Sequence, residues 1–180
     1  MNIRTANLDD LTKIANLHAQ SWRENYREAL SNNYLENQVF ADREKVWSER
    51  LNMPLDNQLV LVAELSGVFR GFICAFGAHH VVHGSIIDNL HVVNRYKGQG
   101  IGTQLLASAA KWANENYPND KLYLEVLACN TKAYGFYQSI GAKEVSIAYW
   151  NTPCNNRVKE YLLGWESPGV LANKVSVNVR

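Results

Sequence analysis

The stretch between residues 86 and 113 constrains the fold more than any other part of the chain. An apolar run over residues 86–93 predicts a buried strand, and glycines follow at positions 98, 100 and 102. From Ile101 the apolar residues recur at helical spacing. A strand, a glycine-rich turn and a helix leave backbone N–H groups free at the helix start, and such groups bind phosphate. The sequence therefore predicts an anion-binding loop.

Two widespread phosphate loops do not match the spacing of these glycines. The dinucleotide fingerprint Gly-x-Gly-x-x-Gly needs a third glycine where Thr103 or Leu105 stands. The nucleoside-triphosphate loop needs Gly-Lys where the chain has Thr103 and Gln104. Taken alone, the loop leaves one further interpretation open, a tight turn whose glycines merely permit positive φ.

Size and composition limit the possible classes of protein. The chain has 180 residues, 47% of them hydrophobic, which predicts a single domain with a sizeable core. A net charge of +1 argues against a general nucleic-acid binder. No apolar run reaches the length of a membrane span and no signal peptide is evident, so we expect no membrane association. Three cysteines without CxxC spacing favour a reducing, cytoplasmic location.

Apolar patterns and turn residues divide the chain into alternating elements. Strands are predicted over residues 3–6, 59–65, 68–76, 85–93, 121–127, 143–150 and 157–165, and helices over 9–22, 100–116 and 131–140. Between residues 22 and 53 we expect two or three short helices, broken near residues 31–33. These elements predict one mixed α/β domain over residues 1–166, with a central sheet and helices on both faces. The tail, residues 167–180, gives no clear signal.

Two motifs in the middle of the chain identify a family resemblance. The first opens the central helix and the second lies downstream; they read Arg95-x-x-Gly98-x-Gly100 and Asn130-x-x-Ala133-x-x-Phe136-Tyr137-x-x-x-Gly141. Together they resemble the GCN5-related N-acetyltransferases, the GNAT superfamily, closely over residues 86–142 and more loosely elsewhere. The resemblance implies the GNAT fold, with a mixed, mostly antiparallel sheet of about seven strands. It also implies acetyl-CoA as co-substrate.

The resemblance carries coenzyme-binding roles onto matching positions of this chain. The strand before the loop would pair with the pantetheine amides and supply a main-chain N–H to the thioester carbonyl, beside a bulge; the matching residues are Leu90, His91 and Val92. The loop would hold the pyrophosphate, with residues Arg95, Lys97, Gly98, Gln99, Gly100, Ile101, Gly102 and Thr103. The second motif would lie beside the pantetheine arm through Asn130 and Tyr137. Without the motif, Arg95 and Lys97 are simply solvated loop charges.

Two residues are candidates for catalysis. Tyr137 matches the family's general acid for the departing thiolate, although it also continues a core-facing stripe of its helix. Glu125 is the one acid in an otherwise apolar strand, where burial would raise its pKa toward that of a usable base. Its setting is similar to the N-terminal-alanine acetyltransferases of ribosomal proteins, in which the matching glutamate is the base. An outward-facing Glu125, with His91, Asp88 or a water relay as base, stays open.

The acceptor is expected beside the helical region that begins at Trp22, with Trp22 and Tyr26 as substrate-binding residues. The predicted function is direct transfer of acetyl to a primary amine of a small molecule or of a peptide or protein N-terminus. Alternatives are a coenzyme A-binding regulatory or interaction module without turnover, another acyl group or a hydroxyl acceptor, and a covalent route through Cys129. The spacing of His79, His80 and His83 predicts no metal site. A homodimer is possible.

Overall fold

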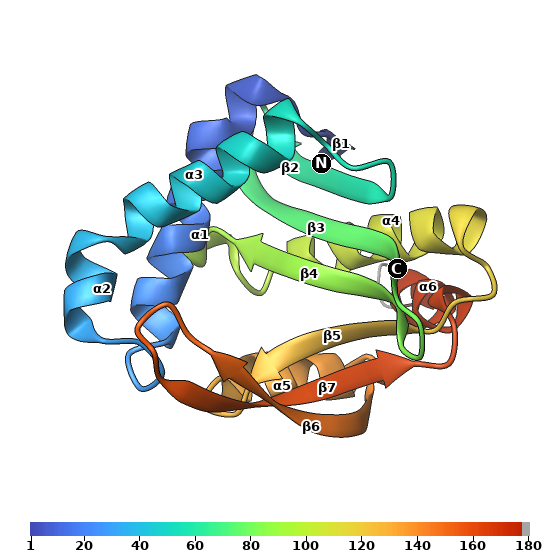
Figure 1. Ribbon diagram of the computed structural model, residues 1–180. Helices are drawn as coiled ribbons and strands as arrows, with labels where there is room; N and C mark the ends of the chain where they lie inside the picture. The colour runs from blue at the N-terminus through green and yellow to red at the C-terminus, as the bar shows by residue number, and fades with distance from the viewer. Residues whose placement is uncertain (178–180) are drawn as a thin grey trace.

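Seven strands form one open sheet in the computed structural model, which describes residues 1–177 (Figure 1). Their spatial order is β1-β2-β3-β4-β5-β7-β6. Their bounds are Asn2–Thr5, Gln58–Leu65, Val68–His80, Gly84–Val92, Leu122–Leu127, Lys143–Asn151 and Arg157–Trp165 for β1 to β7. All neighbours are antiparallel except β4 and β5, which are parallel. The predicted mixed, mostly antiparallel sheet is confirmed.

Helices cover both faces of this sheet, as predicted. They are α1 (Leu11–Asn25), α2 (Asn32–Asn37), α3 (Val39–Asn52), α4 (Ile101–Asn116), α5 (Thr131–Ser139) and α6 (Pro168–Val177), with short 3-10 turns at Leu8–Asp10 and Asn94–Tyr96. On one face, α1 and α3 bury Ile14 and Trp47 against Phe72 of β3. On the other, α4, α5 and α6 pack around Leu105 and Leu106, both fully buried.

The expected helical region divides where the sequence predicted. Helix α1 continues beyond Trp22 to Asn25, and the chain then turns before α2. Ser31 caps α2, because its side-chain oxygen accepts a hydrogen bond from the Tyr34 N–H at 3.2 Å. The predicted break near residues 31–33 is therefore the start of a capped helix.

The two central strands separate soon after they begin to pair. Only Ser85, Ile86 and Ile87 of β4 lie opposite residues of β5. On the other side of β4, the register with β3 shifts between Ile87 and Asn89, which leaves Asp88 as the extra residue of a β-bulge. The bulge bends β4 away from β5, and Figure 1 shows the two strands diverging.

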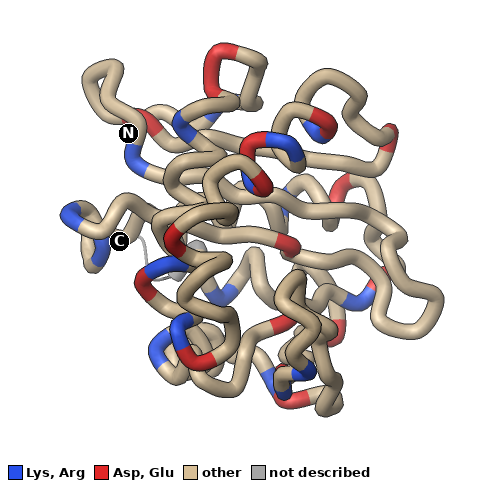
Figure 2. Tube along the Cα trace, turned by 60° about the vertical axis from the view of Figure 1, so that its left-hand side comes forward, with Lys and Arg blue, Asp and Glu red and all other residues tan. Residues whose placement is uncertain are grey.

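Residues of both charge signs are interspersed along the chain (Figure 2). Within residues 1–177, no helix combines the length and the apolar character needed to span a membrane.

The segment after Trp165 adds a helix that the sequence pattern did not predict. Helix α6 packs against α4 and buries Leu171 and Val175 completely. Pro168 begins it, in the first helical position that tolerates a missing N–H. Its ten residues are too few for periodicity to distinguish a helix from an apolar loop. Residues 178–180 of the expected tail lie outside the described residues.

The packing of α6 predicts that it contributes to the stability of the whole fold. Leu171→Ala should lower the free energy of unfolding by roughly 2–5 kcal/mol, because a fully buried leucine is replaced by a cavity. Asn173→Ala, on the exposed side of α6, is the matched control and should change that free energy by about 0.5 kcal/mol or less. Urea unfolding measures both. Equal midpoints for Leu171→Ala and the unmodified protein would contradict the packing role.

Candidate active site

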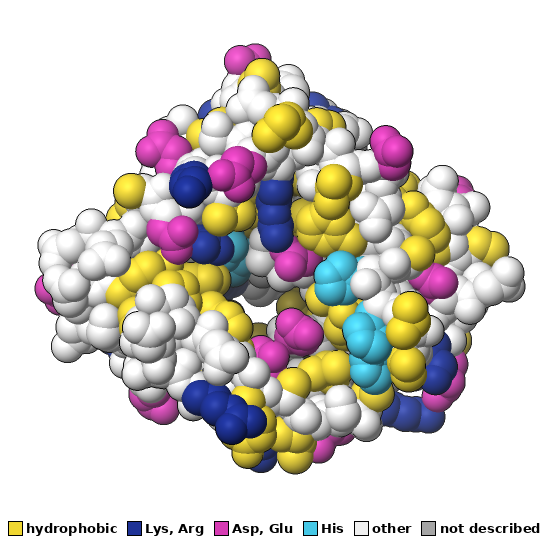
Figure 3. Space-filling view, in the orientation of Figure 1, with side chains coloured by type: hydrophobic (Ala, Val, Ile, Leu, Met, Phe, Trp, Pro, Cys, Tyr) yellow, Lys and Arg dark blue, Asp and Glu magenta, His cyan; other side chains and the backbone are white. Residues whose placement is uncertain are grey.

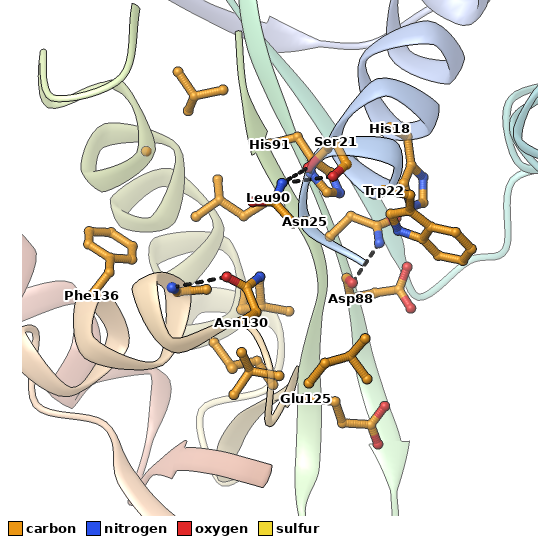
Figure 4. Close-up of a pocket in the computed structure, with 18 of the residues that line it drawn as sticks. His18, Ser21, Trp22, Asn25, Asp88, Leu90, His91, Glu125, Asn130 and Phe136 are labelled. Atoms are coloured by element: carbon orange, nitrogen blue, oxygen red, sulfur yellow. Dashed lines mark hydrogen bonds between the residues drawn. The ribbon is translucent and has the colours of Figure 1, made fainter. Parts of the chain in front are cut away.

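A cleft of about 1030 Å³ opens where β4 and β5 diverge. Its walls come from α1, the end of β4, the start of α4, α5 and the loop between β6 and β7. Figure 3 shows the hollow, with acidic and histidine side chains around it. In the close-up, Asn130 and Phe136 lie on the α5 side of the cleft and Trp22 and His18 on the α1 side (Figure 4).

The glycine loop leaves the first turn of α4 without an internal cap. Gly98 and Gly100 have φ of +77° and +76°, a left-handed conformation that favours glycine. No protein atom lies within 4 Å of a Cβ built at Gly98, so protein packing does not require a glycine there. Gly100 is the N-cap, and it makes no side-chain cap. Because the first bond of the helix runs from the Gln104 N–H to the Gly100 carbonyl, the N–H groups before it have no intrahelical partner.

Most of the predicted coenzyme-binding residues line this one cleft. They are Leu90, His91, Val92, Lys97, Gly98, Gly100, Ile101, Gly102, Thr103, Asn130 and Tyr137. Arg95 and Gln99 do not line it. The Arg95 guanidinium lies 4.8 Å from the centre of the Tyr96 ring and borders a smaller pocket beside α1. The Gln99 amide donates to the Arg95 carbonyl at 3.5 Å.

Helix α5 positions Tyr137. Asn130 caps this helix as predicted, since its side-chain oxygen accepts a hydrogen bond from the Ala133 N–H at 3.3 Å. Nearly two turns after Asn130, Tyr137 lines the cleft, which Tyr26, the C-cap residue of α1, also lines. Burial, and secondarily the neighbouring Tyr26, raises the pKa of Tyr137 above its ordinary value. Tyr137 therefore carries a proton at neutral pH and can donate it.

Three carboxyl groups line the other side of the cleft: Asp88 from the bulge of β4, Glu125 from β5 and Glu160 from β7. Asp88 is paired with Arg50 of α3, whose Nη1 lies 2.6 Å from its Oδ2. Glu125 is exposed to the cleft, and partial desolvation there, followed by the charge of Asp88, raises its pKa above the ordinary value. Burial, and then Glu125, raises the pKa of Glu160 to about 7. Glu160 is thus suited to exchange protons near neutrality, and Glu125 is a stronger base than a fully solvated glutamate.

Sequence reasoning missed Glu160 and Arg50. Glu160 precedes the apolar residues of β7, but its place beside Glu125 depends on a strand register that the letters do not encode. Arg50 also donates to the side-chain oxygen of Asn89 at 3.2 Å, so it contacts both residues at the bulge. The sequence shows that Arg50 is a basic residue near the end of a helical segment, but it does not show that Asp88 is its partner.

The histidines of the cleft are neutral at neutral pH. The Nδ1 of His91 lies 3.0 Å from the Ser21 hydroxyl oxygen, and its ring lies 4.8 Å from that of His18. Burial, with a smaller contribution from Lys97, lowers the pKa of His91 to about 3. Burial also lowers the pKa of His18, whose Nδ1 accepts a hydrogen bond from the Trp47 indole at 3.0 Å. His91 is consequently a weaker base than either glutamate.

The predicted substrate-binding aromatics form part of the α1 wall. Trp22 and Tyr26 line the cleft, and their ring centroids lie 5.6 Å apart. The Trp22 ring also contacts Trp150 of β6 at 5.5 Å and lies under the guanidinium of Arg43. These rings therefore belong to the core and to the cleft surface at once.

Two further expectations concern cysteine and metal. Cys129 does not line the cleft, and burial raises the pKa of its thiol, which disfavours the nucleophilic thiolate.

Among residues 1–177, no three His, Cys, Asp or Glu side chains are grouped so that they could hold a metal ion. His79 instead bonds the Tyr123 hydroxyl at 2.7 Å, and the rings of His80 and His83 stack.

Comparison with known proteins gives consistent results. The model of the acetyltransferase (GNAT) family matches residues 12–142. An uncharacterized N-acetyltransferase, YuaI of Bacillus subtilis, is 27% identical over 99% of both chains. An N-alpha-acetyltransferase of Sulfurisphaera tokodaii is 36% identical over 61 residues, 34% of this chain and 36% of its own.

The fold also matches solved structures. The PaiA N-acetyltransferase of Thermoplasma acidophilum, crystallised in complex with coenzyme A, aligns with a TM-score of 0.66 and 23% identity. The alignment covers 88% of this chain and 96% of that one. Because the family model matches well over half of the residues, the chain belongs to the acetyltransferase (GNAT) family.

Proposed function

We propose that this acyltransferase moves the acetyl group of acetyl-CoA directly to a primary amine. The observation that carries the proposal is that one cleft contains the uncapped start of α4, a protonated Tyr137 and the partly desolvated Glu125. An anion site, an acid and a base are the groups that acetyl transfer from a thioester to an ammonium substrate requires.

The coenzyme would bind along the start of α4 and the free edge of β4. Free N–H groups after Gly100 suit the pyrophosphate, and Lys97 adds positive charge nearby. Beyond Ile87, β4 has no strand partner on its β5 side. The backbone of residues 90–92 on that edge suits the amides of the pantetheine arm, which would pair with it as an added strand does. A main-chain N–H there would polarise the thioester carbonyl.

The chemistry follows from this arrangement. Glu125 takes a proton from the ammonium group, directly or through water, and the amine nitrogen attacks the thioester carbon. The tetrahedral intermediate loses a nitrogen-bound proton to solvent and collapses with cleavage of the carbon–sulfur bond. Tyr137 donates its proton to the departing sulfur and is later reprotonated from solvent. The products are an N-acetyl amide, coenzyme A with a free thiol, and one released proton.

The acceptor side of the cleft supports an ammonium-bearing substrate. Trp22 and Tyr26 provide an aromatic wall, and Glu125 and Glu160 provide negative charge close by. The same surfaces suit a small amine and the N-terminus of a peptide. The name of the Sulfurisphaera relative, N-alpha-acetyltransferase, adds weight to the second class.

A direct test measures release of free thiol from acetyl-CoA with a panel of small amines, amino acids and peptides. We expect acetyl transfer to at least one amine, with the acetamide identified by mass spectrometry. Tight coenzyme A binding without transfer to any acceptor would instead support a binding module that lacks turnover.

The loop at Gly100 predicts a specific loss of coenzyme binding. Gly100→Asp should weaken coenzyme A binding about tenfold or more, because it adds a negative charge beside the phosphates. Gly67→Asp is the matched control, since Gly67 has φ of +74° and open space around it but lies in the remote β2–β3 turn. Calorimetric titration should give an unchanged Kd for Gly67→Asp. Equal affinities for both variants would show that the loop does not hold the phosphates.

The position of Tyr137 predicts a loss of turnover without a loss of binding. Tyr137→Phe should lower kcat about 100-fold, because the departing thiolate no longer receives a proton from a positioned acid. Its Kd for coenzyme A should stay close to that of the unmodified protein. Tyr134→Phe is the control, since the Tyr134 hydroxyl bonds Glu144 at 3.0 Å outside the cleft. A normal kcat for Tyr137→Phe across the pH range would remove Tyr137 as the acid.

A further inference from the structure

Glu125 and Glu160 are neighbours on one face of the antiparallel pair β5–β7. Glu125 lies opposite Leu162, and Glu160 lies opposite Leu127. Residues two apart on a strand share a face, so the two glutamates occupy diagonal positions on the same face of the ladder. Both line the cleft. The strand register therefore holds the two carboxyl groups close together at the acceptor side.

Among the described residues, no basic side chain forms an ion pair with Glu125 or Glu160. Asp88 of β4 and His79 and His80 at the end of β3 act on Glu125 from neighbouring strands. Tyr26, the residue after α1, interacts electrostatically with Glu160. Arg50, which also lines the cleft, is paired with Asp88. Within residues 1–177, neither Glu125 nor Glu160 has an ion-pair or hydrogen-bond partner through its side chain.

We propose that Glu125 and Glu160 share one proton through electrostatic coupling and not through a direct hydrogen bond, with Glu125 as the base for the ammonium substrate and Glu160 as the residue that strengthens this base. The inference rests on the proposed function for the role of Glu125, but the sharing of a proton does not. Two carboxylates at diagonal positions on one face of a sheet repel each other when both are charged, so the second ionisation of the pair is disfavoured. Burial, and then the charge of Glu125, raises the pKa of Glu160, which agrees with this placement.

The pair would also match the substrate. With one proton bound, it carries a single negative charge that attracts an ammonium group. When this remaining proton has also left, Glu125 can accept a proton from the ammonium group of the substrate. An isolated and solvated glutamate does so poorly, because its carboxylate is a weaker base. Glu160 is thus a positioning residue that acts through Glu125 and does not need to contact the substrate.

The test is the pH dependence of kcat/KM with the best amine of the panel. Glu160→Gln keeps the shape of the side chain and removes its charge, so the pKa of Glu125 should fall. The ascending acidic limb of the profile should then move to lower pH by about one unit. Glu166→Gln, exposed just after β7, is the matched control and should leave the limb in place. An unmoved limb in Glu160→Gln would overturn the proposal.

A second readout does not depend on turnover. Carbon-13 NMR of labelled glutamate carboxyl groups follows the titration of Glu125, assigned by the signal lost in Glu125→Gln. The Glu125 midpoint should fall in Glu160→Gln, and the Glu160 midpoint should fall in Glu125→Gln. If both fall but no amine is acetylated, the shared proton stands and the proposed function fails. If an amine is acetylated and neither midpoint moves, the proposed function stands and the shared proton is overturned.

Discussion

The cleft depends on one interruption of the sheet, the point after Ile87 at which β4 and β5 stop pairing. The extra residue Asp88 bends β4, and Arg50 contacts Asp88 and Asn89 from across the α3 face. The Arg50 guanidinium in turn lies over the rings of Trp47 and Phe76. An ion pair supported by packed aromatic rings therefore fixes the shape of the bulge. The separation of the strands, the free edge of β4 and the opening of the cleft all follow from it.

Burial shifts the pKa values of several side chains that line this opening. It raises the pKa of the Tyr137 phenol and of both glutamates and lowers that of His91, because in each case it disfavours the charged form. Tyr137 therefore stays a proton donor, the glutamates become stronger bases, and the histidine stays neutral. A single physical cause thus places a proton donor on one side of the cleft and proton acceptors on the other.

The sequence predicted the helices and strands better than the contacts between them. The glycine loop, the Asn130 cap and the clustering of most residues predicted to bind the coenzyme depend on local backbone rules, which act over a few residues. Arg95 and Gln99 do not line the cleft, because no local rule directs a polar side chain on a loop. The pairing of Glu160 with Glu125, the bulge at Asp88 and the ion pair with Arg50 arise from strand register and from contacts far apart in the chain. Helix α6 is short, and only its packing against α4 distinguishes it from a loop.

The unpaired edge of β4 has a consequence for the stability of the protein. Exposed strand edges invite pairing with other chains, and this edge is sheltered inside the cleft between α1 and α5. A ligand that completes the hydrogen bonds of this edge would bind the folded chain and not the unfolded one. Its concentration would therefore shift the folding equilibrium, so that the protein would resist heat better when this ligand is abundant than when it is scarce.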